Sequence, residues 1–515
     1  MSLSWIDLVI LGVYFLLLIG VGILVGARQK DQKDYLLAGN RIPGWALGLS
    51  ILGTCISSVT YVAYPGKSFQ SDWQYLVQGL TLPLLVACGM LAVIPYYRKY
   101  VKLSVTEFME ARFGAGVRFY TMLCLVIFEI TRLATVMYLT ALVIHTITGF
   151  SISAMILLTG VITVIYTVAG GIEGEIWNDV IQTIVLFAGG FCAILFIGLS
   201  YPDGFAGVFK FAAEHHKFKL FEFTPTLARP TFYVLFLSGL VNFFYFLAGN
   251  QNQVQRYECA KTEAEARRAT LIGSLGSVPI WALFMLVGTF LWVFYQHNPD
   301  PRVAEFLSEN KPDKVFPHFI ATQLPEGLAG LLLAGLFASA TSTLDSSMVT
   351  ISTLVITDVY LKLFKPARND KRELLVSRLL MLFWGILGIL IALLMIKVGT
   401  FLEFYFRVFS ILGGSITGLF ALALFFRKAS AKGAWIGIIA GLLITGWGTL
   451  SYLKTGNWNL RLPLFPWDPM MVGVVATGVV VLIGWIFSLV LPDKIKRQIP
   501  TLWNITKNPI SGGKG

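Results

Sequence analysis

The chain has 515 residues, of which 56% are apolar and only 13% are charged, whereas a soluble domain carries roughly 25% charged residues. This composition excludes an ordinary soluble enzyme, a disordered chain and a disulfide-rich scaffold, because those classes have fewer apolar residues or more cysteines. A membrane-spanning helix takes roughly 20 apolar residues. The sequence therefore predicts an all-α integral membrane protein with many spans.

Apolar runs separated by charged, proline-containing or glycine-rich breaks predict thirteen transmembrane helices. They begin near residues 5, 45, 75, 119, 151, 177, 231, 270, 327, 374, 400, 434 and 468. The first run has no basic leader and is too long for a cleaved signal peptide, so we expect it to be retained as a span. No long polar linker interrupts the chain, which predicts one membrane domain without a soluble appendage.

The net charge of +12, from 40 Lys and Arg against 28 Asp and Glu, has a topological explanation. Most basic residues fall in the predicted loops after odd-numbered spans and in the C-terminal tail. The positive-inside rule then places the N-terminus outside and the C-terminus in the cytoplasm, across the inner membrane if the chain is bacterial. This distribution argues against nucleic acid as a partner.

The second predicted span carries small and polar residues at mid-depth, and polar residues inside a span are functional candidates by default. Glycine and clustered hydroxyl residues favour local unwinding, which frees backbone carbonyls to face a cavity. Close packing of small residues between helices is the alternative explanation. The run comprises Gly53, Thr54, Cys55, Ile56, Ser57, Ser58 and Thr60.

The ninth predicted span places four hydroxyl residues on one helical face, because they follow at i, i+3, i+4 and i+7. Hydroxyl oxygens, together with carbonyls from an unwound neighbour, suit a monovalent cation such as sodium, whereas Mg²⁺ and Ca²⁺ recruit more carboxylates. Asp345 adds a carboxylate beside this face. Alternatively, the hydroxyls bond to carbonyls of their own helix. The four residues are Ser339, Ser342, Thr343 and Ser346.

Two further spans contain charged side chains. Asp179 in the sixth span needs a cation, a proton or a basic side chain as its partner, unless it lies at the interface or caps the helix. Arg132 in the fourth span offers a bidentate fork for a carboxylate. Glu129 lies three residues earlier on the same helical face and is an alternative, internal partner for this arginine.

Four segments in chain order resemble the sodium/solute symporter family, which includes sodium-coupled sugar, sialic acid, proline, pantothenate and iodide transporters. DYLLAGNRIPGWALG resembles the segment that enters span two, and GGIEGEIWNDVIQ resembles the loop into span six. NQNQVQRYECAKTEAEARR resembles the motif that leaves a broken seventh span, and the hydroxyl face of span nine resembles the sodium helix.

The resemblance implies a LeuT-like fold with two inverted five-helix repeats, in which ligands bind near the midplane where spans two and seven are discontinuous. Residues 1–41 would form a peripheral helix and a cytoplasmic loop, and residues 42–202 the first repeat. Residues 203–428 would form the second repeat with external loops, and residues 429–515 two peripheral helices and a cytoplasmic tail.

The resemblance also assigns ion ligands. The primary sodium site would use the carbonyls of Gly53, Ile56 and Ser339 with the hydroxyls of Ser342 and Thr343. Some members bind a second sodium, and the matching positions here are Asp179, Ser342, Asp345 and Ser346. The sialic acid branch has Ser at position 345, so Asp345 is expected either to tighten this second site or to bind a proton.

Within the family, ISSVTYVAYPGKSFQSDWQYL most resembles span two of bacterial sialic acid transporters. Arg132 would hold the substrate carboxylate, and Ser57 and Thr60 would form hydrogen bonds with the substrate. Further substrate contacts are expected from Thr54, Cys55, Gln78, Asn242 and Phe246. The chain departs from this branch in having Cys55 for Thr, Gly79 for Gln with Gln78 adjacent, Asn242 one position from the usual Asn, and Glu129 beside the arginine.

The function expected from the resemblance is sodium-coupled symport of a small organic solute by alternating access, rather than an enzymatic reaction. A carboxylate-bearing sugar such as sialic acid is the favoured substrate, with a neutral sugar, a monocarboxylate or an amino acid as alternatives. A channel or substrate sensor on the same scaffold is the alternative from another class. The expected partners are sodium ions, the solute and the lipid bilayer, and a monomer is one option for the assembly.

Overall fold

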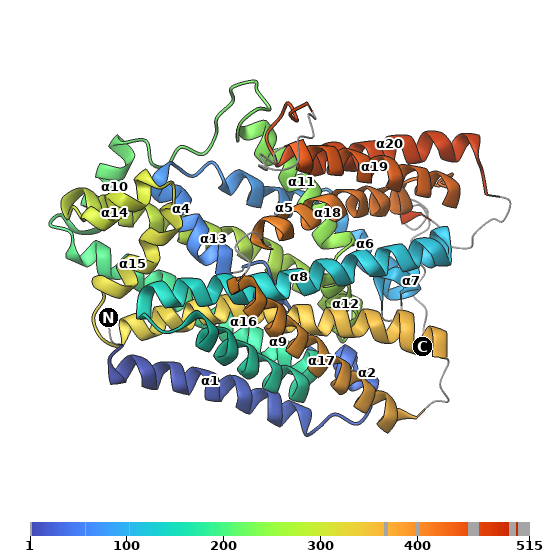
Figure 1. The fold of residues 1–515 in the computed structure, drawn as a ribbon, viewed down its shortest axis with the longest axis horizontal. Coiled ribbons are helices and arrows are strands. Elements are labelled where there is room, and N and C mark those ends of the chain that lie inside the picture. Colours follow the sequence, from blue (N-terminus) through green and yellow to red (C-terminus); the bar gives the residue numbers. More distant parts are fainter. Residues whose placement is uncertain are drawn as a thin grey trace.

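The computed structural model describes residues 3–56, 58–101, 104–364, 369–397, 401–451, 463–493 and 501–502, without the side chains of residues 58, 59, 397 and 401–412. Within these ranges the chain is helical, and the extended pairing is limited to an isolated bridge between Ile42 and Ala260. The long helices lie side by side along one direction (Figure 1). This arrangement confirms the predicted all-α class.

The principal helices, in chain order, are α1 (Trp5–Gly26), α3 (Gly44–Thr54), α4 (Ser58–Gln70), α5 (Leu76–Ala87), α6 (Val93–Tyr100), α8 (Ala115–Thr148), α9 (Ile152–Ser200), α11 (Phe232–Ala248), α12 (Gln251–Cys259), α13 (Glu263–His297), α16 (Leu328–Val355), α17 (Asp370–Lys397), α18 (Phe401–Phe425), α19 (Ala431–Ser451) and α20 (Met471–Val490). Shorter connecting helices are α2 (Gln32–Leu37), η1 (Ala38–Asn40), η2 (Met90–Ala92), α7 (Val105–Phe113), α10 (Gly204–Glu214), α14 (Pro301–Ser308), η3 (Pro312–Lys314), α15 (Val315–Thr322) and the π-helix η4 (Ile356–Phe364).

Eight helices in the described part of the chain are long and apolar enough to cross a membrane, or up to ten if each of two bent pairs is one span. The bent pairs are the segments 76–100, with a bend of 61°, and 232–259, with a bend of 44°. Thirteen spans therefore remain a prediction.

The two breaks expected in spans two and seven are present. The helix of span two ends at Thr54 and resumes at Ser58, so the cluster of small and hydroxyl residues does interrupt it. The helix of span seven ends at Ala248, and the Asn250 side chain accepts a hydrogen bond from Gln253 N (3.2 Å) to begin α12. Such breaks leave backbone groups available at mid-depth.

The predicted fifth and sixth spans meet in α9, where Gly171 has a non-helical backbone with φ of 54°. Glycine is required here, because a Cβ atom would lie 2.5 Å from Tyr35 O and an L-residue disfavours this φ. The turn lets the second half of α9 carry Glu175 and Asp179 into the protein interior, where both are fully buried.

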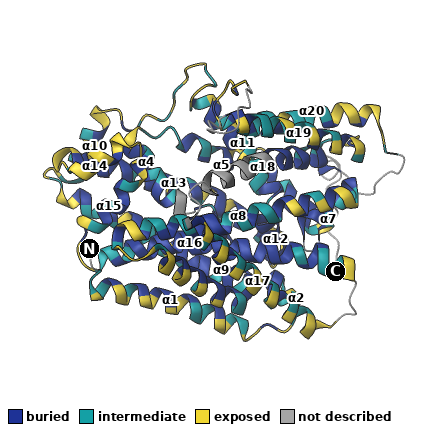
Figure 2. Cartoon of the chain, viewed as in Figure 1, coloured by how far each residue is buried: buried dark blue, intermediate teal, exposed yellow. Residues whose placement is uncertain are grey.

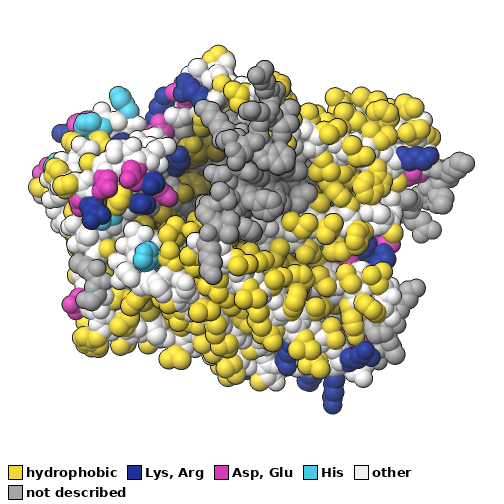
Figure 3. Space-filling view, viewed as in Figure 1, with side chains coloured by type: hydrophobic (Ala, Val, Ile, Leu, Met, Phe, Trp, Pro, Cys, Tyr) yellow, Lys and Arg dark blue, Asp and Glu magenta, His cyan; other side chains and the backbone are white. Residues whose placement is uncertain are grey.

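The centre of the bundle is α16, in which every residue from 332 to 354 is buried. This helix packs against α9, α8, α1 and α17, and Figure 2 shows the buried residues concentrated along it. By contrast, α19 and α20 pack on each other and on α18 at one edge. Apolar side chains cover much of the visible surface between two charged ends (Figure 3), as expected for a protein that faces lipid.

One part of the charge interpretation is wrong. Arg256 is one of the basic residues that follow the seventh predicted span and were therefore assigned to a loop, but it lies in α12 with a completely buried side chain. Arg118 lies in α8 and pairs with Glu110 and Asp358 (2.5 Å to each). These arginines enter the protein because carboxylates from other helices compensate their charge.

Candidate functional site

The hydroxyl face of α16 is buried and turned inward, as predicted. The Ser339 hydroxyl donates to Leu336 O (2.8 Å), and the hydroxyls of Ser342 and Thr343 both donate to Ser339 O (3.3 Å each). Bonding within the helix, the alternative noted above, thus occurs in the structure. Two donors share one carbonyl at the long end of the hydrogen-bond range, so turning them toward a cation would sacrifice little.

The interrupted region of span two lies in the same part of the molecule, because both α3 and α4 pack against α16. Gly53 O accepts a hydrogen bond from Ile56 N (3.1 Å), and Ile56 is fully buried. Gly53 also lies tightly against the second half of α9, since a Cβ atom on it would be 2.7 Å from Thr183 Oγ1. The elements expected to hold the primary sodium therefore adjoin one another.

A buried ionic cluster joins α3, α9, α12 and α16. Arg256 Nη2 donates to Glu175 Oε1 and to Asp179 Oδ2 (2.8 Å each), and it lies 3.5 Å from Ser346 Oγ. Ser50 completes the cluster, because its hydroxyl donates to Asp179 Oδ2 (2.6 Å) and accepts from Arg256 Nε (2.9 Å). Asp179 thus has a basic side chain as its partner, one of the options that the sequence left open.

The cluster contains more negative than positive charge. Asp345 is fully buried and accepts hydrogen bonds from Tyr166 OH (2.8 Å) and from Ser346 N (2.7 Å), but it forms no ion pair within the described ranges. Glu175 Oε2 and Asp179 Oδ1 are buried and also without a partner there. Two carboxylates share one guanidinium, and a third buried carboxylate has no ion pair in the described part of the chain, so this region favours an additional cation.

Sequence reasoning missed Arg256 and Glu175 as site residues. Both lie in the quoted motifs, and Ser346 Oγ donates to Glu175 Oε1 (2.8 Å). The sequence could have indicated Glu175, because this acid lies four residues before Asp179 and therefore on the same helical face. The helical pattern alone gave no reason to connect this pair with an arginine 77 residues after Asp179.

Arg132 lies near Glu129, as the spacing suggested. Arg132 Nη1 is 3.5 Å from Glu129 Oε2, which is longer than a charge-assisted hydrogen bond. The same oxygen accepts a hydrogen bond from Ser347 Oγ (2.6 Å) on α16. The Arg132 side chain is 18% exposed and that of Glu129 is 3% exposed, so the guanidinium retains donors for another partner.

The other expected substrate residues lie on or beside α3, α4, α5 and α11. Thr54 donates to Ser50 O (2.9 Å), and Cys55, Thr60, Gln78 and Phe246 are half-buried. Ser57 lies outside the described residues.

Asn242 is exposed and helps to line a cavity of about 210 Å³ between α8, α11, α18 and the start of α20. Phe128 and Tyr245 also line this cavity. Phe128 precedes Arg132 by one helical turn, so the cavity begins on the face of α8 that carries Arg132.

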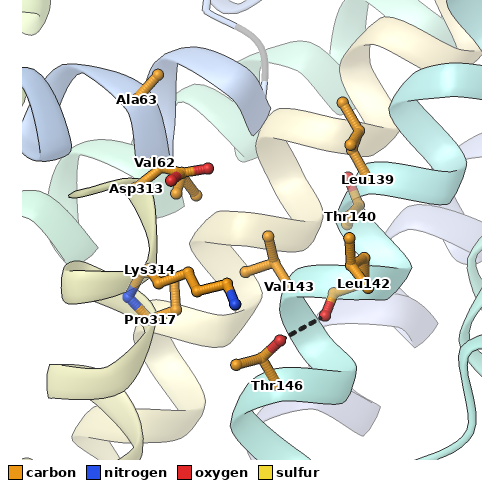
Figure 4. Close-up of a pocket in the computed structure, with 10 residues that line it drawn as sticks. All are labelled: Val62, Ala63, Leu139, Thr140, Leu142, Val143, Thr146, Asp313, Lys314 and Pro317. Carbon is orange, nitrogen blue, oxygen red and sulfur yellow. Dashed lines mark hydrogen bonds between the residues drawn. The ribbon is translucent and has the colours of Figure 1, made fainter. Parts of the chain in front are cut away.

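A second cavity, of about 150 Å³, lies between α4, α8 and the η3–α15 segment (Figure 4). Apolar residues such as Val62, Leu139 and Val143 form most of its wall, and Asp313 and Lys314 extend toward it from η3. None of the predicted site residues lines this cavity.

Comparison with known proteins agrees with these features. The family profile of the sodium:solute symporters matches residues 35–441. The chain belongs to the sodium:solute symporter family. Sodium is accordingly the coupling ion of this multi-pass membrane transporter.

The alignments with individual relatives extend over nearly the whole chain. A sodium/sialic acid symporter from Aliivibrio fischeri is 30% identical over 503 residues, which cover 96% of this chain and 95% of the relative. A solved Na⁺-coupled sialic acid symporter in a substrate-bound, outward-open state has a TM-score of 0.86 and 29% identity, with 95% and 99% coverage. A solved nucleobase-cation-symport-1 family transporter has a TM-score of 0.54, 14% identity and coverage of 90% and 94%, a likeness of fold alone.

Proposed function

We propose that this symporter uses the sodium gradient to take up a carboxylate-bearing sugar, with sialic acid (N-acetylneuraminate) as the best candidate. The observation that carries this proposal is Arg132, a guanidinium inside a predicted span whose contact with Glu129, at 3.5 Å, leaves donors free. A planar guanidinium is suited to bidentate recognition of a carboxylate. The names of the relatives support the same substrate class.

The proposed architecture follows the LeuT-like scheme. In this proposal residues 42–202 and 203–428 form the two repeats, preceded by residues 1–41 and followed by residues 429–515, and the chain crosses the membrane thirteen times. Its N-terminus lies outside and its C-terminus in the cytoplasm of a bacterial inner membrane. The breaks at 54–58 and 248–251 support this scheme, because discontinuous helices mark the binding region of inverted-repeat transporters.

In the proposed primary sodium site, the hydroxyls of Ser342 and Thr343 turn from Ser339 O toward the ion. The carbonyls of Gly53, Ile56 and Ser339 complete the shell. This geometry joins the broken span two to α16, so an ion holds together two elements that must separate when the protein opens to the other side.

A second sodium is proposed between Asp179, Ser342, Asp345 and Ser346. The excess of buried carboxylate charge supports it. The substrate contacts of Ser57, Thr60, Thr54, Cys55, Gln78, Asn242 and Phe246 remain proposals of the same kind.

Coupling requires that sodium and substrate each raise the affinity for the other, typically by about 1–3 kcal/mol. External sodium stabilises the outward state, the two ligands become occluded together, and low internal sodium then weakens the site. A membrane potential adds about 2.3 kcal/mol per charge for each 100 mV.

The proposal can be tested with the full chain in proteoliposomes that have an inward sodium gradient. We expect accumulation of labelled N-acetylneuraminate with sodium and none with potassium. The double variant Ser342→Ala, Thr343→Ala should lose accumulation, whereas Ser352→Ala, another buried serine of α16, should retain it. Normal salt dependence in the double variant would refute the primary sodium site.

The substrate is tested separately by thermal shift with sialic acids, neutral sugars, monocarboxylates and proline, each in sodium and in potassium. Stabilisation by N-acetylneuraminate only in sodium supports the proposal, and stabilisation by another class instead replaces the substrate. Counterflow distinguishes a transporter from a sensor, and currents far above carrier turnover would identify a channel.

A further inference from the structure

Glu129 places a negative charge next to the arginine that is proposed to bind a negative substrate. Its Oε2 atom is 3.5 Å from Arg132 Nη1, in a side chain that is 3% exposed. A carboxylate in this position competes with the substrate for the guanidinium. The proposed function gives no reason for such a competitor. The other contacts of the Glu129 side chain indicate what role it could have.

The stronger contact of Glu129 is with the sodium helix. Ser347 Oγ donates to Glu129 Oε2 at 2.6 Å, and α8 packs against α16. Ser347 follows Thr343 by one turn on the same face. Because both residues lie on one continuous helix, any movement of α16 at Thr343 would also move Ser347. One carboxylate oxygen thus touches both the ion-binding helix and the substrate arginine.

We propose that Glu129 is a positioning residue that transmits sodium occupancy to Arg132. With sodium bound, the contacts are those of the structure: Ser347 holds the Glu129 carboxylate on α16 at 2.6 Å, and the Arg132 guanidinium, 3.5 Å from that carboxylate, is free for the substrate carboxylate. Without sodium, the Ser347 contact loosens, Glu129 pairs fully with Arg132, and carboxylate binding weakens. This inference rests on the proposed function, because it requires a substrate that carries a carboxylate.

We call this connection from Ser347 through Glu129 to Arg132 the relay. It predicts opposite effects for substitution of Glu129 and of Ser347. Glu129→Gln removes the competing charge, so the Kd for N-acetylneuraminate should fall in potassium and approach its value in sodium. Ser347→Ala releases Glu129 onto Arg132, so the Kd should rise in sodium. The double variant should behave as Glu129→Gln, because a neutral amide does not compete with the substrate carboxylate for Arg132, whether or not Ser347 donates a hydrogen bond to it.

Isothermal titration of the purified full chain with N-acetylneuraminate, in sodium and in potassium, measures these effects. We expect the unsubstituted protein to bind at least about 10-fold more tightly in sodium, within the usual range of coupling, and Glu129→Gln to reduce the ratio to about 2-fold or less. Ser352→Ala is the matched control and should keep the full ratio. The methyl ester of N-acetylneuraminate, which lacks the negative charge, should show no change of Kd on Glu129→Gln.

Three results would overturn the relay. One is an unchanged sodium dependence in Glu129→Gln with binding intact. Another is an equal weakening of acid and methyl ester in both salts, which a merely structural role would produce. The third is loss of the sodium-induced thermal shift without substrate, which would make Glu129 an ion ligand. Absence of N-acetylneuraminate binding by the unsubstituted protein would instead refute the substrate, and the relay with it.

Discussion

Removal of the Arg256 charge should destabilise the symporter more than most single substitutions. Arg256 is completely buried, and its Nη2 atom donates to both Glu175 and Asp179 at 2.8 Å. In Arg256→Gln the two carboxylates, which are also completely buried, lose their common counter-charge. Asp345 adds a third carboxylate to the same region.

The magnitude follows from the two distances. At 2.8 Å and an effective dielectric constant of about 20, each ion pair gains about 6 kcal/mol of Coulomb energy. The cost of removing the guanidinium from water offsets much of this gain. We therefore expect a net loss of about 3–5 kcal/mol, as when one partner of a buried ion pair is removed.

Thermal unfolding of the purified protein, in sodium and in potassium, is the assay. Arg256→Gln should have a lower Tm, and sodium should raise that Tm by more than it does for the unsubstituted protein, because a cation replaces part of the missing charge. The double variant Arg256→Gln, Asp179→Asn should recover part of the loss, since it removes one of the unpaired charges. A Tm of Arg256→Gln equal to that of the unsubstituted protein, or no recovery in the double variant, would refute this account.

Two further predictions concern sites outside this cluster. Lys217 lies in a connection between helices and donates to Phe69 O (2.9 Å) at the end of α4; burial, opposed by the nearby Asp72, lowers its pKa to about 8. In the unfolded chain the pKa of a lysine amine is near 10.4. Between about pH 8 and 10 the unfolded chain therefore binds more protons at Lys217 than the folded protein does, so the free energy of unfolding should rise as pH increases from about 8 to about 10. Measured as Tm against pH, this rise should be smaller in Lys217→Met. An unchanged slope would contradict the lowered pKa of Lys217. Gly171→Ala should cost about 1–3 kcal/mol of stability, because its φ of 54° is strained for an L-residue and the added Cβ would meet Tyr35 O at 2.5 Å. Urea denaturation measures this loss, and Gly12→Ala, where a Cβ meets nothing within 4 Å, is the control.

The sequence alone determined the features that depend on local pattern. Long apolar runs have a stable place only in lipid, so they predicted the helical membrane fold. The weak helix formers around Gly53 predicted the break that the structure has between Thr54 and Ser58. The spacing from Ser339 to Ser346 put the hydroxyls on one face because the helical period is fixed, and that face is buried.

Only the tertiary structure decided which charges meet. Arg256 lies 81 residues from Glu175 and 77 from Asp179, and Ser347 lies 218 residues from Glu129. No local period relates such positions, because their distance depends on how α8, α9, α12 and α16 pack. A charged side chain in a membrane protein needs a partner, which the sequence can predict, but the identity of that partner follows from packing.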